Sequence, residues 1–266
     1  MAGGNRRDVQ RWRIIPQLHP CPQNGMLKGG MDSPIMKTRF RRDPLIIGCV
    51  STAGGLRRCA RRRPAFCDMV EVRLDMTGLC GGDWQTLCGA IQQSGMPVLL
   101  TIRSPAEGGH WTGRESERLA LYSAGFSSVS AVDLEIRSHA FQLLAKKAHR
   151  SGIKVVGSFH DFHRTPELAC LQQIVVKGRR LGADVVKIAT MVRTSRDLAR
   201  LFAVPYKVSG RVCVMGMGSR GMISRVALPG AGSCLAYGAL DASTAPGQLP
   251  VRRLAWELAH WGIRQA

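Results

Sequence analysis

The sequence lacks the marks of several protein classes. No window approaches the roughly 18 uninterrupted apolar residues of a membrane-spanning helix, so we expect a soluble protein that does not enter a membrane. Its nine cysteines include no Cys-x-x-Cys pair, which argues against a zinc site and for reduced thiols in the cytoplasm. Aromatic residues make up only 6%, and no RNA-recognition or helix-turn-helix signature accompanies the basic runs. Nucleic-acid binding is therefore not expected as the main function.

Acidic residues are also scarce, with 18 Asp and Glu against 38 Lys and Arg, so the formal net charge is +20. Residues 1–43 carry nine Lys or Arg and three Asp, and a second basic cluster spans Arg57–Arg63. Positive charge suits anionic partners, from nucleic acid to small carboxylates, but says nothing about the fold. A solvated basic surface is the simplest interpretation.

Residues 1–43 show neither helical nor strand periodicity and are rich in Arg, Pro and Gly. We expect a disordered basic leader here. An organelle transit peptide, or a start codon assigned too far upstream, would have a similar composition. Residues 44–266 are expected to form a single catalytic domain.

Eight apolar, β-branched runs follow Asp43, and most are apolar on both faces, as in parallel strands covered on both sides. These runs are Leu45–Val50, Met69–Leu74, Val98–Ile102, Val129–Leu134, Ile153–Val156, Val185–Ile188, Val212–Met215 and Cys234–Tyr237. Helix-compatible segments alternate with them at Trp84–Ser94, Glu115–Ala124, His139–Ser151, Pro166–Leu181, Ser195–Val204 and Val251–Ile263. Eight such units predict a (β/α)8 barrel rather than an open sheet.

Two crossovers are expected to be short. The arginine-rich first crossover, Gly55–Phe66, is predicted to form a weak helix at best, and the seventh lies near Ser219–Val226.

Polar side chains gather at the carboxyl ends of the predicted strands, where barrel enzymes place their chemistry. In chain order they are Ser51 after the first run; Glu71, Arg73 and Asp75 on the second; Arg103 and Glu107 after the third; Asp133 and Glu135 on the fourth; His160, Asp161 and His163 after the fifth; Lys187 within the sixth; Ser224 and Arg225 after the seventh; and Ser243–Gln248 after the eighth.

Lys187 interrupts an apolar run, and His160 follows the preceding strand. Burial and nearby arginines are expected to depress the pKa of Lys187, and a neutral amine is what attack on a ketone requires. The pattern leaves equally open that Lys187 points outward between the helices. His160 on its own fits a structural loop histidine. With His163 it makes a poor metal pair, because no third ligand is evident.

Arg73, Arg103 and Arg225 are expected at the same end of the barrel, where they would repel each other without an anion. A carboxylate, bound bidentately by a guanidinium, is the favoured ligand. Phosphate is the competitor, but the glycines at Gly216–Gly221 precede no well-formed helix.

With these residues assembled, the chain resembles the type I 3-dehydroquinate dehydratases of the shikimate pathway of aromatic amino-acid biosynthesis. The matching segments, spread from Leu45 to the C-terminus, are Glu71–Asp75, Thr101–Gly109, Val132–Glu135, His160–Pro166, Val186–Ala189, Gly221–Arg225 and Ala245–Gln248. The resemblance implies a (β/α)8 barrel, usually a homodimer without metal or cofactor, that dehydrates 3-dehydroquinate to 3-dehydroshikimate through an imine.

The resemblance also implies roles for individual residues. Lys187 is the Schiff-base lysine, His160 is the general acid/base with a pKa near the operating pH, and Glu107 orients His160. Arg225 grips the substrate carboxylate. The other substrate contacts expected are Ser51, Glu71, Arg73, Arg103, Thr244 and Gln248, the last of these ending a lid after the eighth strand. The family usually has a serine at the position of Thr244, so either Thr244 or Ser243 supplies the hydroxyl.

The alternative enzyme is another class I Schiff-base aldolase on the same barrel. The arginine set with Gln248 suits a polyhydroxylated carboxylate better than a sugar phosphate. The residues do not separate aromatic biosynthesis from quinate breakdown.

Overall fold

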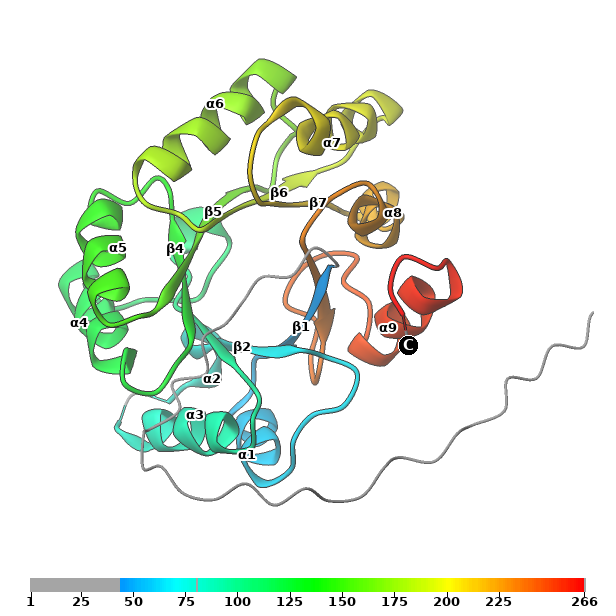
Figure 1. Cartoon of the computed structure of the whole chain (residues 1–266). Helices are drawn as coiled ribbons and strands as arrows, with labels where there is room; N and C mark the ends of the chain where they lie inside the picture. The colour runs from blue at the N-terminus through cyan, green and yellow to red at the C-terminus, as the bar shows by residue number, and fades with distance from the viewer. Residues whose placement is uncertain (1–43, 80, 266) are drawn as a thin grey trace, which may run out of the picture. The chain divides into compact units, whose positions relative to one another are not determined.

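The computed structural model describes residues 44–79 and 81–265, so the predicted leader lies outside the described residues. The described chain forms eight parallel strands that follow one another in sequence order around a barrel (Figure 1). They are β1 (Leu45–Val50), β2 (Met69–Arg73), β3 (Val98–Thr101), β4 (Ala131–Glu135), β5 (Lys154–Asp161), β6 (Val185–Met191), β7 (Val212–Met217) and β8 (Leu235–Ala239).

The barrel is nearly closed. Parallel ladders join each strand from β1 to β7 to the next, and β8 pairs with β1. Among the described residues β7 and β8 form no ladder, but the amide of Cys234 donates to the carbonyl of Val212 at 2.8 Å. Nearby, the Ser233 hydroxyl accepts from the amide of Val214 at 2.9 Å. The seam between β7 and β8 therefore depends partly on side chains, and the predicted (β/α)8 barrel is confirmed.

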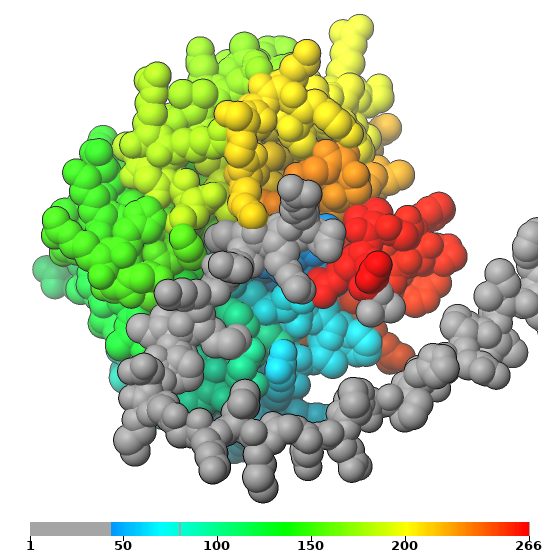
Figure 2. Space-filling model, viewed as in Figure 1, coloured from blue at the N-terminus to red at the C-terminus, as the bar shows by residue number. Residues whose placement is uncertain are grey.

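Helices cover the outside of the strands (Figure 1), and the colours run in chain order around the barrel (Figure 2). The helices are α1 (Ala53–Arg61), α2 (Leu74–Thr77), α3 (Asp83–Gln93), α4 (Glu115–Gly125), α5 (Phe141–Arg150), α6 (Leu168–Arg180), α7 (Ser195–Lys207), α8 (Ser224–Gly230) and α9 (Val251–His260), with 3-10 turns η1 (Pro105–Glu107) and η2 (Ser219–Gly221). None of the helices in the described ranges is long and apolar enough to span a membrane.

Two apolar layers hold this arrangement together. Trp84, Tyr122 and Phe141 are buried between the helices and the outer face of the strands. Inside the barrel, Ile47 and Leu99 belong to a second cluster of side chains that fills the space below the polar site. Both faces of the strands are thus apolar, which explains the continuous apolar runs in the sequence.

The first crossover differs from its prediction, because α1 is a regular nine-residue helix. Thr52 caps its N-terminus by accepting from the amide of Gly55 at 2.9 Å, and Leu56 and Cys59 are buried beneath it. Asp241, from the loop after β8, accepts from the Thr52 amide at 3.0 Å and its hydroxyl at 2.7 Å. A carboxylate from a distant segment therefore supports a helix that looked weak by local pattern.

The fifth strand is longer than predicted. Its pairing with β6 continues from Val156 opposite Val185 to Asp161 opposite Thr190, so β5 ends at Asp161 rather than at Val156. His160 and Asp161 therefore lie on the strand and not in a loop. Asp75, predicted on the second strand, lies in α2.

We predict that replacing Tyr122 with Phe lowers the stability of the barrel. The Tyr122 hydroxyl donates to the carbonyl of Asp133 at 2.7 Å and accepts from the amide of Ile102 at 2.9 Å. Without it these buried backbone groups lose a partner, which costs about 1–3 kcal/mol in free energy of unfolding. Denaturant unfolding measures this loss. Tyr206, which is 73% exposed, gives the matched control Tyr206→Phe, and an equal loss in both variants would contradict the prediction.

Candidate active site

A pocket of about 500 Å³, including space open to solvent, is lined by every residue to which the resemblance assigns a role except Ser51. It is lined by Cys49, Glu71, Arg73, Arg103, Glu107, Gly108, His160, Phe162, Lys187, Ala189, Met215, Met217, Arg225, Tyr237, Thr244, Ala245 and Gln248. Because all the strands are parallel, residues far apart in the sequence meet at one end of the barrel.

Lys187 points into this pocket from β6 and is 5% exposed. Its Nζ donates to Oδ2 of Asp133 at 3.0 Å and to Oε1 of Glu71 at 3.4 Å, and it lies 4.0 Å from the centre of the Tyr237 ring. The alternative of an outward-pointing lysine is therefore wrong.

The predicted direction of the Lys187 pKa is also wrong for the unliganded protein. Burial lowers the pKa of Lys187, but Asp133 and Glu71 raise it, and the net direction is upward from the ordinary value. Two buried carboxylates outweigh desolvation and the repulsion of Arg103. Lys187 is therefore a protonated ammonium that must lose a proton before it can attack a carbonyl.

His160 and Glu107 form a pair beside Lys187. The Nδ1 of His160 is 2.9 Å from Oε2 of Glu107, which also accepts from the His160 amide at 3.1 Å. Burial, together with Arg103 and Lys187, holds the pKa of His160 well below its ordinary value, rather than near the operating pH as predicted. With Glu107 ionised, Nδ1 carries the hydrogen and Nε2 has a lone pair available for a proton.

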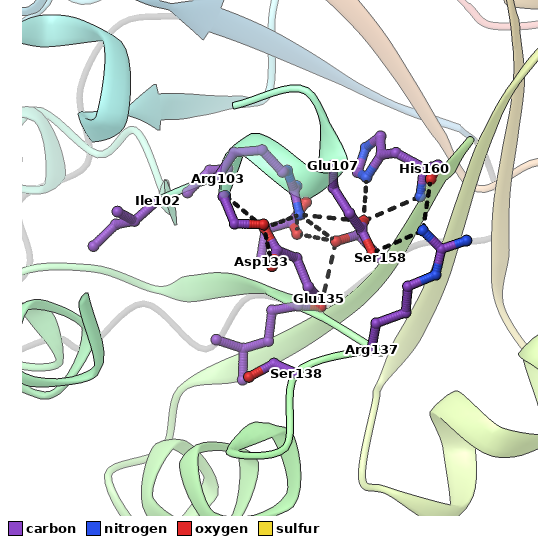
Figure 3. Close-up of polar contacts among 12 residues, drawn as sticks. Ile102, Arg103, Glu107, Asp133, Glu135, Arg137, Ser138, Ser158 and His160 are labelled. Carbon is purple, nitrogen blue, oxygen red and sulfur yellow. Dashed lines mark hydrogen bonds and ion pairs between the residues drawn. The ribbon is translucent and has the colours of Figure 1, made fainter. Parts of the chain in front are cut away.

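Arg103 lies next to this pair, and carboxylates of the protein balance its charge (Figure 3). It donates to Oδ1 of Asp133 at 2.8 Å and to the Ser158 hydroxyl at 2.7 Å, and it lies 3.5 Å from Glu135. Burial raises the pKa of Asp133, but the effect of Arg103 and Lys187 in the opposite direction is larger. The net pKa is below the ordinary value, and Asp133 stays ionised. Asp133 therefore links Arg103 to Lys187.

The remaining two arginines differ in their partners. Arg73 donates to both carboxylate oxygens of Asp75, at 3.1 and 2.8 Å. Arg225 is 4% exposed, its Nη2 donates to the carbonyl of Pro246 at 3.0 Å, and its Nε has no hydrogen-bond partner. In the described part of the chain no carboxylate pairs with Arg225, and burial lowers its pKa. Arg73 and Arg103 thus have carboxylates of the protein as partners, whereas Arg225 has none among the described residues.

Comparison with known proteins agrees with this geometry. Residues 46–261 match the family model of the type I 3-dehydroquinases. The chain belongs to this family. It is 32% identical over 200 residues to the 3-dehydroquinate dehydratase of Thermodesulfovibrio yellowstonii, covering 74% of this chain and 87% of that protein. It is 36% identical over 198 residues to the enzyme of Methanosarcina barkeri, covering 69% and 81%.

The fold of this 3-dehydroquinase family member also resembles a solved structure. The crystal structure of 3-dehydroquinate dehydratase from Geobacillus kaustophilus superposes with a TM-score of 0.74. The match covers 84% of this chain and 93% of that one, at 24% sequence identity, and it supports the barrel fold alone.

In this family member the loop after β8 closes one side of the pocket through Gln248. Its Oε1 accepts from the amide and the hydroxyl of Thr244, at 2.7 and 3.0 Å, and its Nε2 lies 3.2 Å from Sγ of Cys49. Thr244 lines the pocket, whereas the exposed Ser243 donates to the carbonyl of Ala245. Of the two hydroxyls left open by the sequence, that of Thr244 is the one at the pocket.

Ser51 is not brought to the pocket. It is buried, and both its amide and its hydroxyl donate to Oδ1 of Asp241 at 3.1 Å. Cys49, two residues earlier on β1, lines the pocket instead, as does Tyr237 on β8. In the sequence both lie within apolar runs, which do not mark them as pocket residues. Their place on one face of their strands was the available signal.

No group of three or more side chains suited to a metal ion occurs in residues 44–79 and 81–265. The carboxylates of Glu71 and Glu107, which line the pocket, and of Asp133, which lies next to it, each contact a lysine, an arginine or a histidine. These carboxylates are therefore engaged in charge pairs within the protein.

We predict that Glu71→Gln lowers the pKa of Lys187, because it removes one of the two carboxylates that stabilise the ammonium. An NMR titration of the Lys187 side chain measures the change. Glu257→Gln, on α9, removes a carboxylate from the outer surface and serves as the control. A Lys187 midpoint that stays in place or rises in Glu71→Gln would contradict this account.

Proposed function

We propose that this chain is a 3-dehydroquinate dehydratase, a hydro-lyase that converts 3-dehydroquinate to 3-dehydroshikimate through an imine on Lys187. The observation that carries the proposal is one pocket that holds a buried amine and a buried guanidinium without a carboxylate partner among the described residues. Such a pocket suits a ligand that has both a ketone and a carboxylate. Membership of the type I 3-dehydroquinase family supports the same substrate.

Arg225 binds the substrate carboxylate in this proposal. Its unpartnered Nε and its Nη groups can donate two parallel hydrogen bonds to a carboxylate. Binding also neutralises a buried cation that has no acidic partner, so the anion gains more here than at an exposed arginine. Gln248 and Thr244 cover the bound ligand, and Arg73 and Glu71 contact it from β2.

Imine formation begins when the Lys187 ammonium loses a proton. Asp133 and Glu71, which contact Nζ, accept this proton, and the two protons that the nitrogen loses in all end on the substrate's carbonyl oxygen, which departs as water. The amine attacks the C3 carbonyl carbon, and the resulting carbinolamine loses water to give a protonated imine. This iminium retains the partners of the ammonium, namely the two carboxylates and the face of the Tyr237 ring.

His160 carries out the proton transfers of the elimination. Its Nε2 takes the proton from C2, and the electron pair of the broken C–H bond moves into the iminium to form an enamine. As the enamine expels the C1 hydroxyl, the imidazolium donates that proton and water leaves. Hydrolysis of the product imine restores Lys187. A positioned acid/base of this kind contributes about 100 to 10,000-fold to the rate.

The low pKa of His160 fits this sequence of steps. The iminium acidifies the C2 proton, so a weak base is sufficient. Once protonated, an imidazole of low pKa is a strong acid for the leaving hydroxyl. Glu107 accepts from Nδ1 throughout and stabilises the imidazolium.

We also propose a location, an oligomeric state and a pathway for the enzyme. The family resemblance and the composition favour a cytoplasmic homodimer that serves aromatic amino-acid biosynthesis. The proposal assigns no cofactor, metal, membrane or nucleic acid to the reaction.

We predict that borohydride reduction in the presence of 3-dehydroquinate leaves a stable adduct on Lys187, located by peptide mass spectrometry. Lys187→Met should lose both the adduct and turnover while keeping the circular dichroism of the barrel. Lys207→Met, which changes an exposed lysine at the end of α7, serves as the control and should retain both. An adduct on another lysine, or full activity in Lys187→Met, would overturn the assignment.

We predict that Arg225→Met lowers kcat/KM by about 10 to 100-fold, because a charge-assisted hydrogen bond contributes roughly 1.5–3 kcal/mol. The loss should appear mainly in KM and should be smaller for a substrate analogue whose carboxylate is replaced by an amide. Steady-state kinetics of both compounds measure it. The exposed Arg57, on α1, gives the control Arg57→Met. If Arg225→Met and the wild type discriminated equally between acid and amide, Arg225 would not bind the carboxylate.

A further inference from the structure

The two oxygens of the Glu107 carboxylate have unequal surroundings. Oε2 accepts hydrogen bonds from Nδ1 and from the backbone amide of His160, whereas Oε1 is buried and has no hydrogen-bond partner. A buried carboxylate oxygen without a donor favours the protonated form of the acid. Something else must therefore favour the ionised form, because only ionised Glu107 leaves the hydrogen of His160 on Nδ1.

Arg137 lies in the loop between β4 and α5, and its Nη1 is 3.9 Å from Oε1 of Glu107. Its Nη1 also donates to the carbonyl of His160 at 3.3 Å, and its guanidinium lies 4.3 Å from the centre of the Phe159 ring. Figure 3 shows the guanidinium alongside Glu107 and His160. The side chain is 51% exposed, but these contacts with β5 hold the charge next to the pair.

Most of the other charged side chains around Glu107 form ion pairs with residues other than Glu107. Arg103 lies 4.0 Å from Oε2, on the other side of the carboxylate, and is paired with Asp133. Glu107 also borders an outer hollow between α4 and the β4–α5 loop. The charged and titratable groups facing Glu107 from the surrounding elements are Arg103, Glu115, Arg118, Asp133, Glu135, Arg137, His139 and His160. Glu115 and Glu135 are both paired with Arg118, which leaves Arg137 as the cation that acts on Oε1.

We propose that Arg137 is a positioning residue for catalysis: its charge keeps Glu107 ionised, so that His160 presents the lone pair of Nε2 to the substrate. The inference rests on the role of His160 in the proposed function. If Glu107 takes a proton, it donates to Nδ1, the hydrogen of the neutral imidazole moves to Nε2, and the base is lost.

The protonation of Glu107 is expected to control activity near neutral pH. Burial raises the pKa of Glu107 to about 7; Glu135 and Asp133 act in the same direction, while Arg103 and Arg137 oppose them. The productive state exists above the pKa of Glu107 and is lost as the pH falls through it. Removing the charge of Arg137 raises that pKa, so activity is lost at a higher pH.

The test is the pH profile of kcat/KM for Arg137→Met and Arg137→Lys beside the wild type. We expect Arg137→Met to move the acid limb upward by roughly half a pH unit to one unit, as for a partly screened charge about 4 Å away. Its rate should approach that of the wild type well above the limb, and Arg137→Lys should restore the wild-type profile. Arg114→Met, which removes an exposed, ion-paired arginine before α4, is the matched control and should leave the profile unchanged.

A loss in Arg137→Met that is equal at all pH values, or a failure of Arg137→Lys to rescue the limb, would overturn the proposal in favour of a purely structural contact. Nitrogen-15 NMR of His160 in the unliganded protein supplies a readout independent of turnover. We expect Arg137→Met to shift the change from the Nδ1–H to the Nε2–H form to higher pH. If that shift occurs but the wild type does not dehydrate 3-dehydroquinate, the proposed function fails and the positioning role stands. If the tautomer change does not shift, the positioning role fails regardless of activity.

Discussion

The site depends on the burial of one ammonium group between two carboxylates inside a parallel barrel. Lys187 is held by Asp133 and Glu71, and Asp133 is in turn held by Arg103. Each of these charges would be very costly to bury alone. Together they form a chain of alternating sign across the barrel, and the apolar layer beneath supports it. The same contacts that stabilise the ammonium are suited to a cationic imine.

This chain of charges also explains why Arg225 stands apart. Arg73 and Arg103 have carboxylates of their own, and they therefore act as fixed parts of the wall. Arg225 has a buried guanidinium with a single carbonyl as its polar partner on Nη2, and its Nε is unused. Among the described residues no carboxylate balances this buried charge. In the proposed function the carboxylate of the substrate supplies the missing counter-charge.

Much of this architecture could be predicted from the sequence. The eight apolar runs predict the barrel. The polar residues that follow these runs predict most of the pocket, because the carboxyl ends of parallel strands meet at one end of a barrel. Contacts between distant segments could not be predicted in this way. The cap that Asp241 supplies to α1 and the extension of β5 to Asp161 both depend on partners far away in sequence. The prediction of a lowered pKa for Lys187 is wrong for the same reason. The sequence shows the nearby arginines, but it does not show that Asp133 pairs with Nζ.

The seam between β7 and β8 separates two parts of the pocket wall. Arg225 follows β7, whereas Thr244 and Gln248 follow β8, so these pocket residues lie on opposite sides of the seam. The neighbouring strands are joined by full ladders, but this pair has a backbone bond from Cys234 to Val212 and the Ser233 hydroxyl. Of the neighbouring strand pairs in the described residues, this is the one that no backbone ladder joins. A shift of the β8 loop relative to Arg225 therefore breaks no backbone ladder.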